Sequence, residues 1–180
     1  MRRPTELNLP NSITILRILV LPFCAYALFK NGGDNTTWRI MAWALFFIVG
    51  LSDMLDGQLA RRRNSVTEFG KLLDPIADKA LIGTAIVSLS ILGHMPWWMT
   101  IVILIREIGI TIFRFAVINK GIIPANRGGK IKTLFQGLAV SLYILPLNSS
   151  WFWFRDIFMY AALALTVGTG FWYVFATRQE

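Results

Sequence analysis

Apolar runs long enough to cross a membrane follow one another along almost the whole of this 180-residue chain. A helix needs about 20 predominantly apolar residues to span the hydrocarbon core of a bilayer. Short polar linkers separate six such segments, at 13–29, 40–60, 72–93, 96–118, 131–147 and 157–176. The sequence therefore predicts an all-α integral membrane protein with six transmembrane helices, forming a single membrane domain over residues 1–180.

The composition supports a membrane protein rather than a soluble one. Hydrophobic residues make up 55% of the chain, charged residues 16%, and the mean hydropathy is +0.55. Soluble domains carry about 25% charged residues on average. The first apolar run contains Arg17 and lacks a small-residue cleavage site, so we expect a retained helix rather than a signal peptide. The stretch TELNLPNSITILR that leads into it is expected to be a short N-terminal interfacial segment.

The net charge of +8 follows from where the basic residues lie. With a cytoplasmic N-terminus, three fall in outer loops, namely Lys30, Arg39 and Arg155. Eleven fall on the inner side, namely Arg2, Arg3, Arg61, Arg62, Arg63, Lys71, Lys120, Arg127, Lys130, Lys132 and Arg178. Cytoplasmic loops carry an excess of Lys and Arg, which predicts a multi-pass protein of the inner (cytoplasmic) membrane with both termini cytoplasmic. The expected partners are membrane lipids, including anionic ones, and no nucleic acid.

Four aspartates lie inside the second and third predicted spans. Asp53 and Asp56 are three residues apart, and Asp74 and Asp78 are four apart, so each pair shares one face of its helix. A short cytoplasmic loop joins the two spans and brings both pairs to the same end of the protein. The sequence therefore predicts that four carboxylates converge just below the inner membrane surface.

Such a cluster needs cations or protons. Two carboxylates 4 Å apart repel by about 4 kcal/mol at an effective dielectric constant near 20. Oxygen ligands select a hard ion, first Mg²⁺ and next Mn²⁺ or Ca²⁺, and two divalent ions would offset the four charges and clamp a diphosphate. The one histidine, His94, falls on the opposite side, which argues against zinc. The alternatives are helix-pairing hydrogen bonds or a proton relay.

The same stretch resembles the CDP-alcohol phosphotransferase family, whose signature is Asp-x2-Asp-Gly-x2-Ala-Arg-x8-Gly-x3-Asp-x3-Asp. All eight fixed positions match, with Asp53, Asp56, Gly57, Ala60, Arg61, Gly70, Asp74 and Asp78. The resemblance implies a six-helix membrane fold, usually a homodimer, that displaces CMP from a CDP-linked donor with an alcohol. It further implies an active site in a cytoplasm-facing cavity.

The resemblance also assigns roles to individual residues. The metal ligands are Asp53, Asp56, Asp74 and Asp78, and Asp78 is also the base that deprotonates the acceptor hydroxyl. The residues expected to bind CDP-diacylglycerol are Asn11, Thr14, Asp53, Asp56, Gly57, Ala60, Arg61 and Gly70. We expect direct displacement, because no Ser, Cys or His in the cluster offers a covalent nucleophile.

Basic residues outside the signature should indicate which acceptor the protein binds. Arg106 and Arg114 share the fourth span, and Glu107 beside Arg106 can hold a guanidinium. One acid against two arginines leaves positive charge for an anion. Lys130 and Lys132 begin the fifth span, where a helix N-terminus suits phosphate, although such lysines also snorkel to lipid headgroups.

Arg17 is expected to meet the same anionic group or the donor's diphosphate. The predicted acceptor-phosphate residues are therefore Arg17, Arg106, Arg114, Lys130 and Lys132. The stretches LPNSITILRI, SDMLDGQLAR, FGKLLDPIADK, REIGITIFR and GKIKTLFQ together resemble the phosphatidylglycerophosphate synthase branch. That likeness implies CDP-diacylglycerol as donor and sn-glycerol 3-phosphate as acceptor, with release of CMP.

Other functions stay open at this point. Inositol phosphate fits the basic residues as well as glycerol 3-phosphate does, whereas serine fits them less well, and phosphatidylglycerol is a further acceptor of this chemistry. A divalent-cation or proton-coupled transporter would also place carboxylates in the membrane. The outer halves of the spans are nearly all apolar, however, which would block an ion path.

Overall fold

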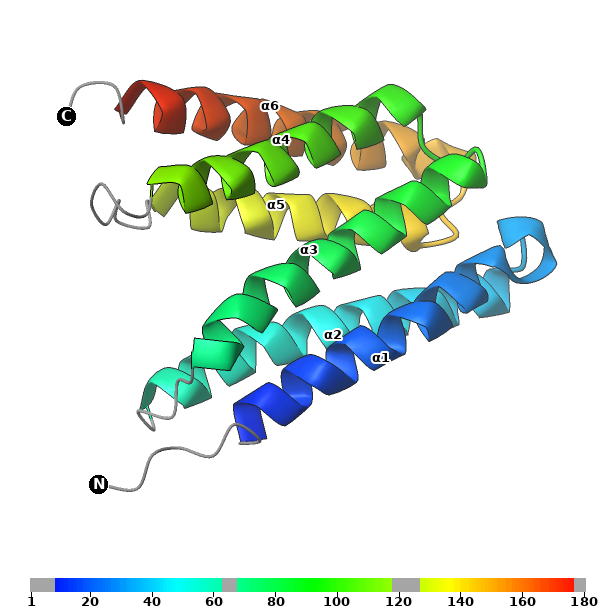
Figure 1. Cartoon of the computed structure of the whole chain (residues 1–180). Coiled ribbons are helices and arrows are strands. Elements are labelled where there is room, and N and C mark those ends of the chain that lie inside the picture. Colours follow the sequence, from blue (N-terminus) through cyan, green and yellow to red (C-terminus); the bar gives the residue numbers. More distant parts are fainter. Residues whose placement is uncertain (1–8, 63–67, 118–126, 177–180) are drawn as a thin grey trace. The chain divides into compact units, whose positions relative to one another are not determined.

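The computed structural model describes the backbone of residues 9–62, 68–117 and 127–176, and the side chains of residues 14–52, 76–113 and 131–172. Within these residues the regular elements are all helical (Figure 1). The long helices are α1 (Leu9–Phe29), α2 (Thr36–Arg62), α3 (Glu68–Ile91), α4 (Trp97–Val117), α5 (Arg127–Ile144) and α6 (Phe152–Ala176). The short 3₁₀ segments η1 (Lys30–Gly33) and η3 (Ser149–Trp151) precede α2 and α6.

Each predicted span corresponds to one long helix, and the differences lie at the ends. Helices α2 and α6 begin four and five residues before the apolar segments, because polar and aromatic residues continue the helix. Helix α5 ends at Ile144, since Pro146 disfavours a helical conformation for the residue before it. Helix α1 already begins at Leu9, with Pro10 in its first turn, where the missing N–H costs no hydrogen bond. The predicted interfacial lead-in is thus helical from Leu9 on, and its earlier part lies outside the described residues.

The surface of the helices is strongly apolar. Among the described residues, one stretch, Thr14–Gly33, is long and apolar enough to cross a membrane, and Thr36–Ser52 and Ile131–Ile144 are shorter apolar stretches. Large apolar side chains are exposed on all six long helices, for example Phe23, Ile48, Ile76, Ile105, Leu134 and Phe171. Exposed apolar surface on this scale is typical of helices that face lipid or another chain. The count of six membrane spans stays a prediction.

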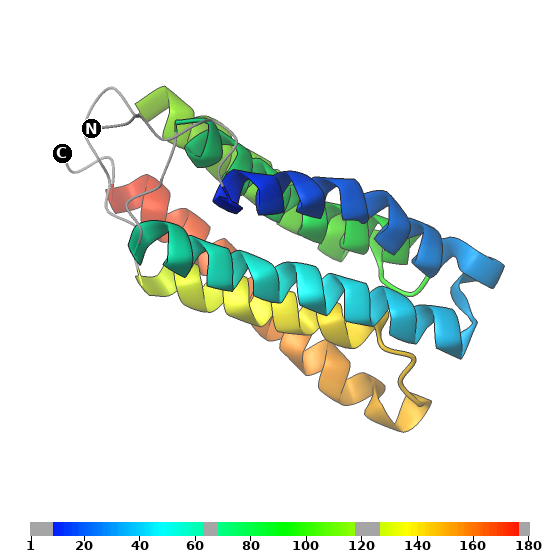
Figure 2. The ribbon, with the colours of Figure 1, turned by 90° about the horizontal axis from the view of Figure 1, so that it is seen from below.

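The chain divides into two compact units, of which the first comprises Met1–Leu92 and Ile144–Pro146. Helix α1 packs against both α2 and α3, and α2 also contacts α3. Figures 1 and 2 show α1 and α2 side by side, joined by the turn at η1. The buried core includes Leu21, Cys24, Ala27, Leu28, Ala42, Phe46, Val49, Ala77, Leu81, Ala85, Ile86 and Leu89. The small alanines let the three helices approach closely.

One arginine ties the separate segment of this unit to α2. Arg39 donates from Nε to the carbonyl oxygen of Ile144 at 3.0 Å and from Nη2 to that of Leu145 at 3.2 Å. Carbonyl groups at a helix end have no intrahelical donor, so the guanidinium satisfies acceptors that would otherwise be costly in an apolar setting. Arg39, predicted as an outer-loop charge, therefore has a structural role inside α2.

The second unit comprises Gly93–Tyr143 and Leu147–Glu180. Helix α4 contacts α6 directly. Between α5 and α6, the rings of Phe135 and Phe158 stack with their centroids 6.1 Å apart. The hydroxyl of Tyr143 donates to Oδ1 of Asp156 at 2.7 Å. The core of this unit contains Met99, Ile103, Ala139, Val140, Met159 and Ala162.

Candidate active site

The first unit holds every residue predicted for the metals and the CDP-linked donor. Asp53, Asp56, Gly57, Ala60 and Arg61 lie on α2, Gly70, Asp74 and Asp78 on α3, and Asn11 and Thr14 on α1. The structure confirms that each aspartate pair lies within one helix, so the three- and four-residue spacings place each pair on one helix face. Because α1, α2 and α3 pack together, the two halves of the signature belong to contacting helices. The side chains at 53–75 lie outside the described residues.

Two polar side chains of α1 are buried inside this unit. Thr14 and Arg17 are each only 3% exposed, and they are spaced three residues apart. Leu21, Cys24 and Leu28 continue the same face of the helix. A buried arginine in an apolar helix is costly unless it is paired, and such residues usually mark functional sites. Asp78 on α3 is partly buried.

The possible metal ligands can be compared with the metal ion that the sequence predicts. Among the side chains that the structure describes, no three of His, Cys, Asp or Glu gather around a common point. Asp53, Asp56 and Asp74 lie outside that set, so a site would have to be built from the aspartates of α2 and α3. Four carboxylates and no nitrogen or sulfur ligand fit Mg²⁺ or Mn²⁺. The residues present are therefore chemically suited to such an ion.

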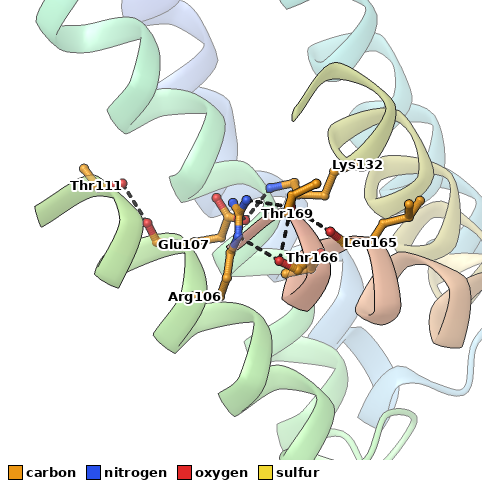
Figure 3. Close-up of polar contacts among 7 residues, drawn as sticks. All are labelled: Arg106, Glu107, Thr111, Lys132, Leu165, Thr166 and Thr169. Atoms are coloured by element: carbon orange, nitrogen blue, oxygen red, sulfur yellow. Dashed lines mark hydrogen bonds and ion pairs between the residues drawn. The ribbon is translucent and has the colours of Figure 1, made fainter. Parts of the chain in front are cut away.

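The second unit contains a compact group of charged side chains, Arg106 and Glu107 of α4 and Lys132 of α5, which we call the basic cluster (Figure 3). The guanidinium of Arg106 donates from Nε to the main-chain oxygen of Thr166 at 3.1 Å and from Nη2 to the hydroxyl of Thr169 at 2.9 Å, both on α6. Nη1 donates to Oε1 of the neighbouring Glu107 at 3.0 Å. The prediction that Glu107 helps to hold a guanidinium is confirmed.

Lys132 of α5 joins the same cluster. Its ammonium group donates to Oε1 of Glu107, the oxygen that also accepts from Arg106 (Figure 3). The side chains of Arg106, Glu107 and Lys132 are 16%, 15% and 6% exposed. At such burial, a carboxylate that forms ion pairs with two cations holds both of them strongly in place. Lys132 is therefore paired with Glu107 in the structure, and its binding of the acceptor's phosphate stays a prediction.

The other residues predicted for the acceptor phosphate divide between the units. Arg114 on α4 and Lys130 on α5 belong to the second unit, but their side chains lie outside the described residues. Arg17 belongs to the first unit. Sequence reasoning missed Thr166 and Thr169, because one contributes a main-chain oxygen and the other a common hydroxyl. The small, polar run Thr-Val-Gly-Thr-Gly within an apolar helix was the available signal.

Comparison with known proteins identifies the family. The sequence profile of the CDP-alcohol phosphatidyltransferase family matches residues 7–168, which span both units. The chain belongs to this family. A protein of Mycobacterium tuberculosis named "Probable phosphatidylglycerophosphate synthase" is 48% identical over 93% of this chain and 80% of its own length.

Two further relatives cover both chains almost completely. The Bacillus subtilis and Rickettsia felis proteins, both named "CDP-diacylglycerol--glycerol-3-phosphate 3-phosphatidyltransferase", are each 37% identical over 96% of this chain and 96% of their own lengths. The family consists of membrane-bound enzymes, which agrees with the apolar surface of the helices. Membership in a family of transferases also removes the reason to consider an ion or proton transporter.

Proposed function

We propose that the chain transfers the phosphatidyl group of CDP-diacylglycerol to sn-glycerol 3-phosphate, giving phosphatidylglycerophosphate and CMP. The observation that carries the reaction type is the complete eight-position signature, divided between two contacting helices of one unit. Relatives named for this reaction, at 37–48% identity over most of the chain, support the choice of acceptor. The basic cluster on α4 and α5 agrees with an acceptor that carries a phosphate.

The donor and the metal ions are assigned to the first unit. Two divalent ions, Mg²⁺ first and Mn²⁺ second, would be held by Asp53, Asp56, Asp74 and Asp78. When bound, they would neutralise charge on the diphosphate and on the departing CMP. Binding of the CDP-diacylglycerol head is assigned to the same aspartates and to Asn11, Thr14, Gly57, Ala60, Arg61 and Gly70. Glycine and alanine suit this task because they let a flat nucleotide come close to the backbone.

The acceptor's phosphate is assigned to basic residues, chiefly of the second unit. Arg106 and Lys132 are already ordered by Glu107, and Arg114 and Lys130 lie on the same two helices. A guanidinium offers forked N–H groups that match phosphate oxygens, and an ammonium adds a point charge. Arg17 is assigned to the acceptor's phosphate or to the donor's diphosphate.

The chemical step is a direct displacement at phosphorus. The carboxylate of Asp78 takes the proton of the acceptor's primary hydroxyl. The hydroxyl oxygen forms a bond to the phosphorus that bears diacylglycerol. The bond from that phosphorus to the bridging oxygen breaks, and CMP leaves with the electron pair. Each step uses a group that the chain or its substrates supply, so no covalent enzyme intermediate is needed.

The membrane arrangement is part of the proposal. Six helices of 18 to 27 residues, all with exposed apolar side chains, support six membrane crossings with both termini in the cytoplasm. This places the signature on the cytoplasmic side of the inner membrane, where glycerol 3-phosphate is available. A homodimer is proposed from the family resemblance.

The test is an acceptor screen with the purified protein in mixed micelles. CDP-diacylglycerol is supplied with Mg²⁺, and glycerol 3-phosphate, inositol phosphate, serine and phosphatidylglycerol are compared side by side for release of CMP. We expect glycerol 3-phosphate to give the highest kcat/KM and phosphatidylglycerophosphate as product. Removal of divalent ions with EDTA should abolish turnover, and Mg²⁺ should restore it.

Two results would contradict the proposal. A preferred acceptor without a phosphate would overturn the acceptor assignment while leaving the reaction type. Release of CMP that is undiminished in EDTA would overturn the metal assignment.

A further inference from the structure

Helix α6 has no role in the signature, yet among the described residues it accepts two of the three hydrogen bonds of Arg106. Thr166, Thr169 and Gly170 are spaced at i, i+3 and i+4, so they lie on one face of α6. The contacts in Figure 3 show that this face meets the guanidinium of Arg106 on α4. The pairing joins residues about 60 positions apart in sequence, which only the packing of α4 against α6 makes possible.

The hydroxyl of Thr169 has a fixed orientation. Its oxygen lies 2.6 Å from the main-chain oxygen of Leu165 and 3.2 Å from that of Thr166. A threonine hydroxyl has a single proton, and the shorter contact to Leu165 is the better place for it. The lone pairs of the oxygen are then available to the Nη2 of Arg106, at 2.9 Å. A hydroxyl that donates in this way becomes a stronger acceptor.

The guanidinium is therefore held in three directions. Nε is bound to the Thr166 oxygen, Nη2 to the Thr169 hydroxyl and Nη1 to the Glu107 carboxylate. Arginine has five N–H groups in one rigid plane. Three of them are used by these contacts within the described residues, which leaves one on each terminal nitrogen for a further acceptor. An anion that accepts from both of these N–H groups would bind a guanidinium plane that the protein has already oriented.

Gly170 of α6 packs against the side chain of Arg106. A Cβ at Gly170 would lie 3.5 Å from Cγ and 3.7 Å from Nε of Arg106, which is ordinary van der Waals contact. Alanine would thus fit at this position.

We propose that Thr169 is a positioning residue for acceptor binding: its hydroxyl orients Arg106 so that the guanidinium's remaining N–H groups take the acceptor's phosphate. This inference rests on the proposed function, in which Arg106 binds that phosphate. It gives α6 a defined part in the reaction, although no atom of α6 need touch a substrate. The effect of Thr169 should appear in acceptor binding and not in donor binding.

The experiment compares Thr169→Val with Thr169→Ser. Valine keeps the shape but removes the hydroxyl, and serine keeps the hydroxyl. Loss of one hydrogen bond to a charged group predicts a rise of roughly ten-fold in the KM for glycerol 3-phosphate in the valine variant. The KM for CDP-diacylglycerol should stay unchanged, and serine should restore the acceptor KM to within about two-fold of wild type. Thr111→Val is the matched control, because the Thr111 hydroxyl donates to the main-chain oxygen of Glu107, the residue next to Arg106.

A double-mutant cycle tests whether Thr169 acts through Arg106. In an Arg106→Ala background, Thr169→Val should raise the acceptor KM no further. An additional rise of the same size there would overturn the inference, and so would an unchanged acceptor KM in Thr169→Val alone. A parallel rise in both substrates' KM would also overturn it, as the sign of a general structural role. Thr169→Ala serves as a second variant if the valine variant unfolds.

The outcome can be separated from a failure of the proposed function. The wild-type acceptor screen decides the function, and the ratio of variant to wild-type KM decides the role of Thr169. If wild type prefers inositol phosphate, the acceptor assignment fails, and the same ratio measured with inositol phosphate still supports or overturns the positioning role. If wild type prefers an acceptor without a phosphate, both fail together.

Discussion

The first unit carries the four signature aspartates on α2 and α3, whereas the second carries Arg106, Glu107 and Lys132 on α4 and α5. In the second unit the chain supplies a counter-charge, because a single oxygen of Glu107 accepts from both cations. In the first unit the proposed counter-charge is two divalent ions that arrive with, or before, the donor. Under the proposed function, the basic cluster is organised before any substrate binds, and the acidic cluster depends on metal.

Substitutions among the aspartates should reduce the rate of the chemical step and leave acceptor affinity largely intact. Substitutions in the basic cluster should change stability and acceptor affinity first.

Asp78→Asn should give the largest loss. It removes the proposed base and one metal ligand together, and loss of a general base alone costs about 10²–10⁴-fold in rate. We expect kcat to fall by at least that factor, measured as CMP release at saturating substrates. The helical circular dichroism signal should be unchanged. The control is Asp34→Asn, the same chemical change at an exposed position before α2, which should leave kcat near wild type. A near-normal rate in Asp78→Asn would contradict the role of Asp78 as base.

The helices could be predicted because their physical cause is local. Apolar runs of membrane length located all six long helices, and the errors lie at the ends, where Pro146 stops α5 early and polar residues extend α2. The family could be predicted for a similar reason, since the signature is a fixed spacing along the chain. The pairing of Arg106 with Glu107 joins sequence neighbours, and it too was visible in the sequence.

The rest of the basic cluster could not be predicted, because it depends on which helices pack together. Lys132 lies 25 residues from Glu107, and nothing in the local pattern of α5 indicates that partner. Thr166 binds Arg106 through its main-chain oxygen, which every residue possesses. Arg39 was assigned to an outer loop because charge near an apolar run suggests a boundary, whereas its partners are carbonyl groups 105 and 106 residues away.

Glu107→Gln should have an intermediate effect, on stability. The substitution leaves Arg106 and Lys132 without the shared negative charge while both are largely buried. Removing one partner of a buried pair costs about 3–5 kcal/mol, and the partial exposure here lowers our expectation to about 2 kcal/mol. The free energy of unfolding in mild detergent measures it. Millimolar inorganic phosphate should restore part of the loss, because an anion can then replace the carboxylate. Unchanged stability would show that the basic cluster does not depend on Glu107.

Tyr143→Phe should have the smallest effect and should leave catalysis alone. The Tyr143 hydroxyl donates to Oδ1 of Asp156 at 2.7 Å, and Nε of Arg155 donates to the same oxygen at 2.9 Å. The carboxylate keeps its arginine partner in the variant, and the guanidinium of Arg155, 4.2 Å from the Tyr143 ring centroid, can still stack on the ring. We therefore expect a loss of about 1 kcal/mol in unfolding free energy.

Both KM values should stay at wild-type levels in this variant, since Tyr143 lies 11 residues beyond Lys132, about 16 Å along α5. Tyr143→Leu also removes the ring and should lose more stability at the same KM. A rise in the acceptor KM for Tyr143→Phe would contradict the division of roles between the two clusters. It would mean that the contact between α5 and α6 near Tyr143 sets the position of Lys132 at the start of α5. The basic cluster would then be organised by the whole helix pair and not by Glu107 alone.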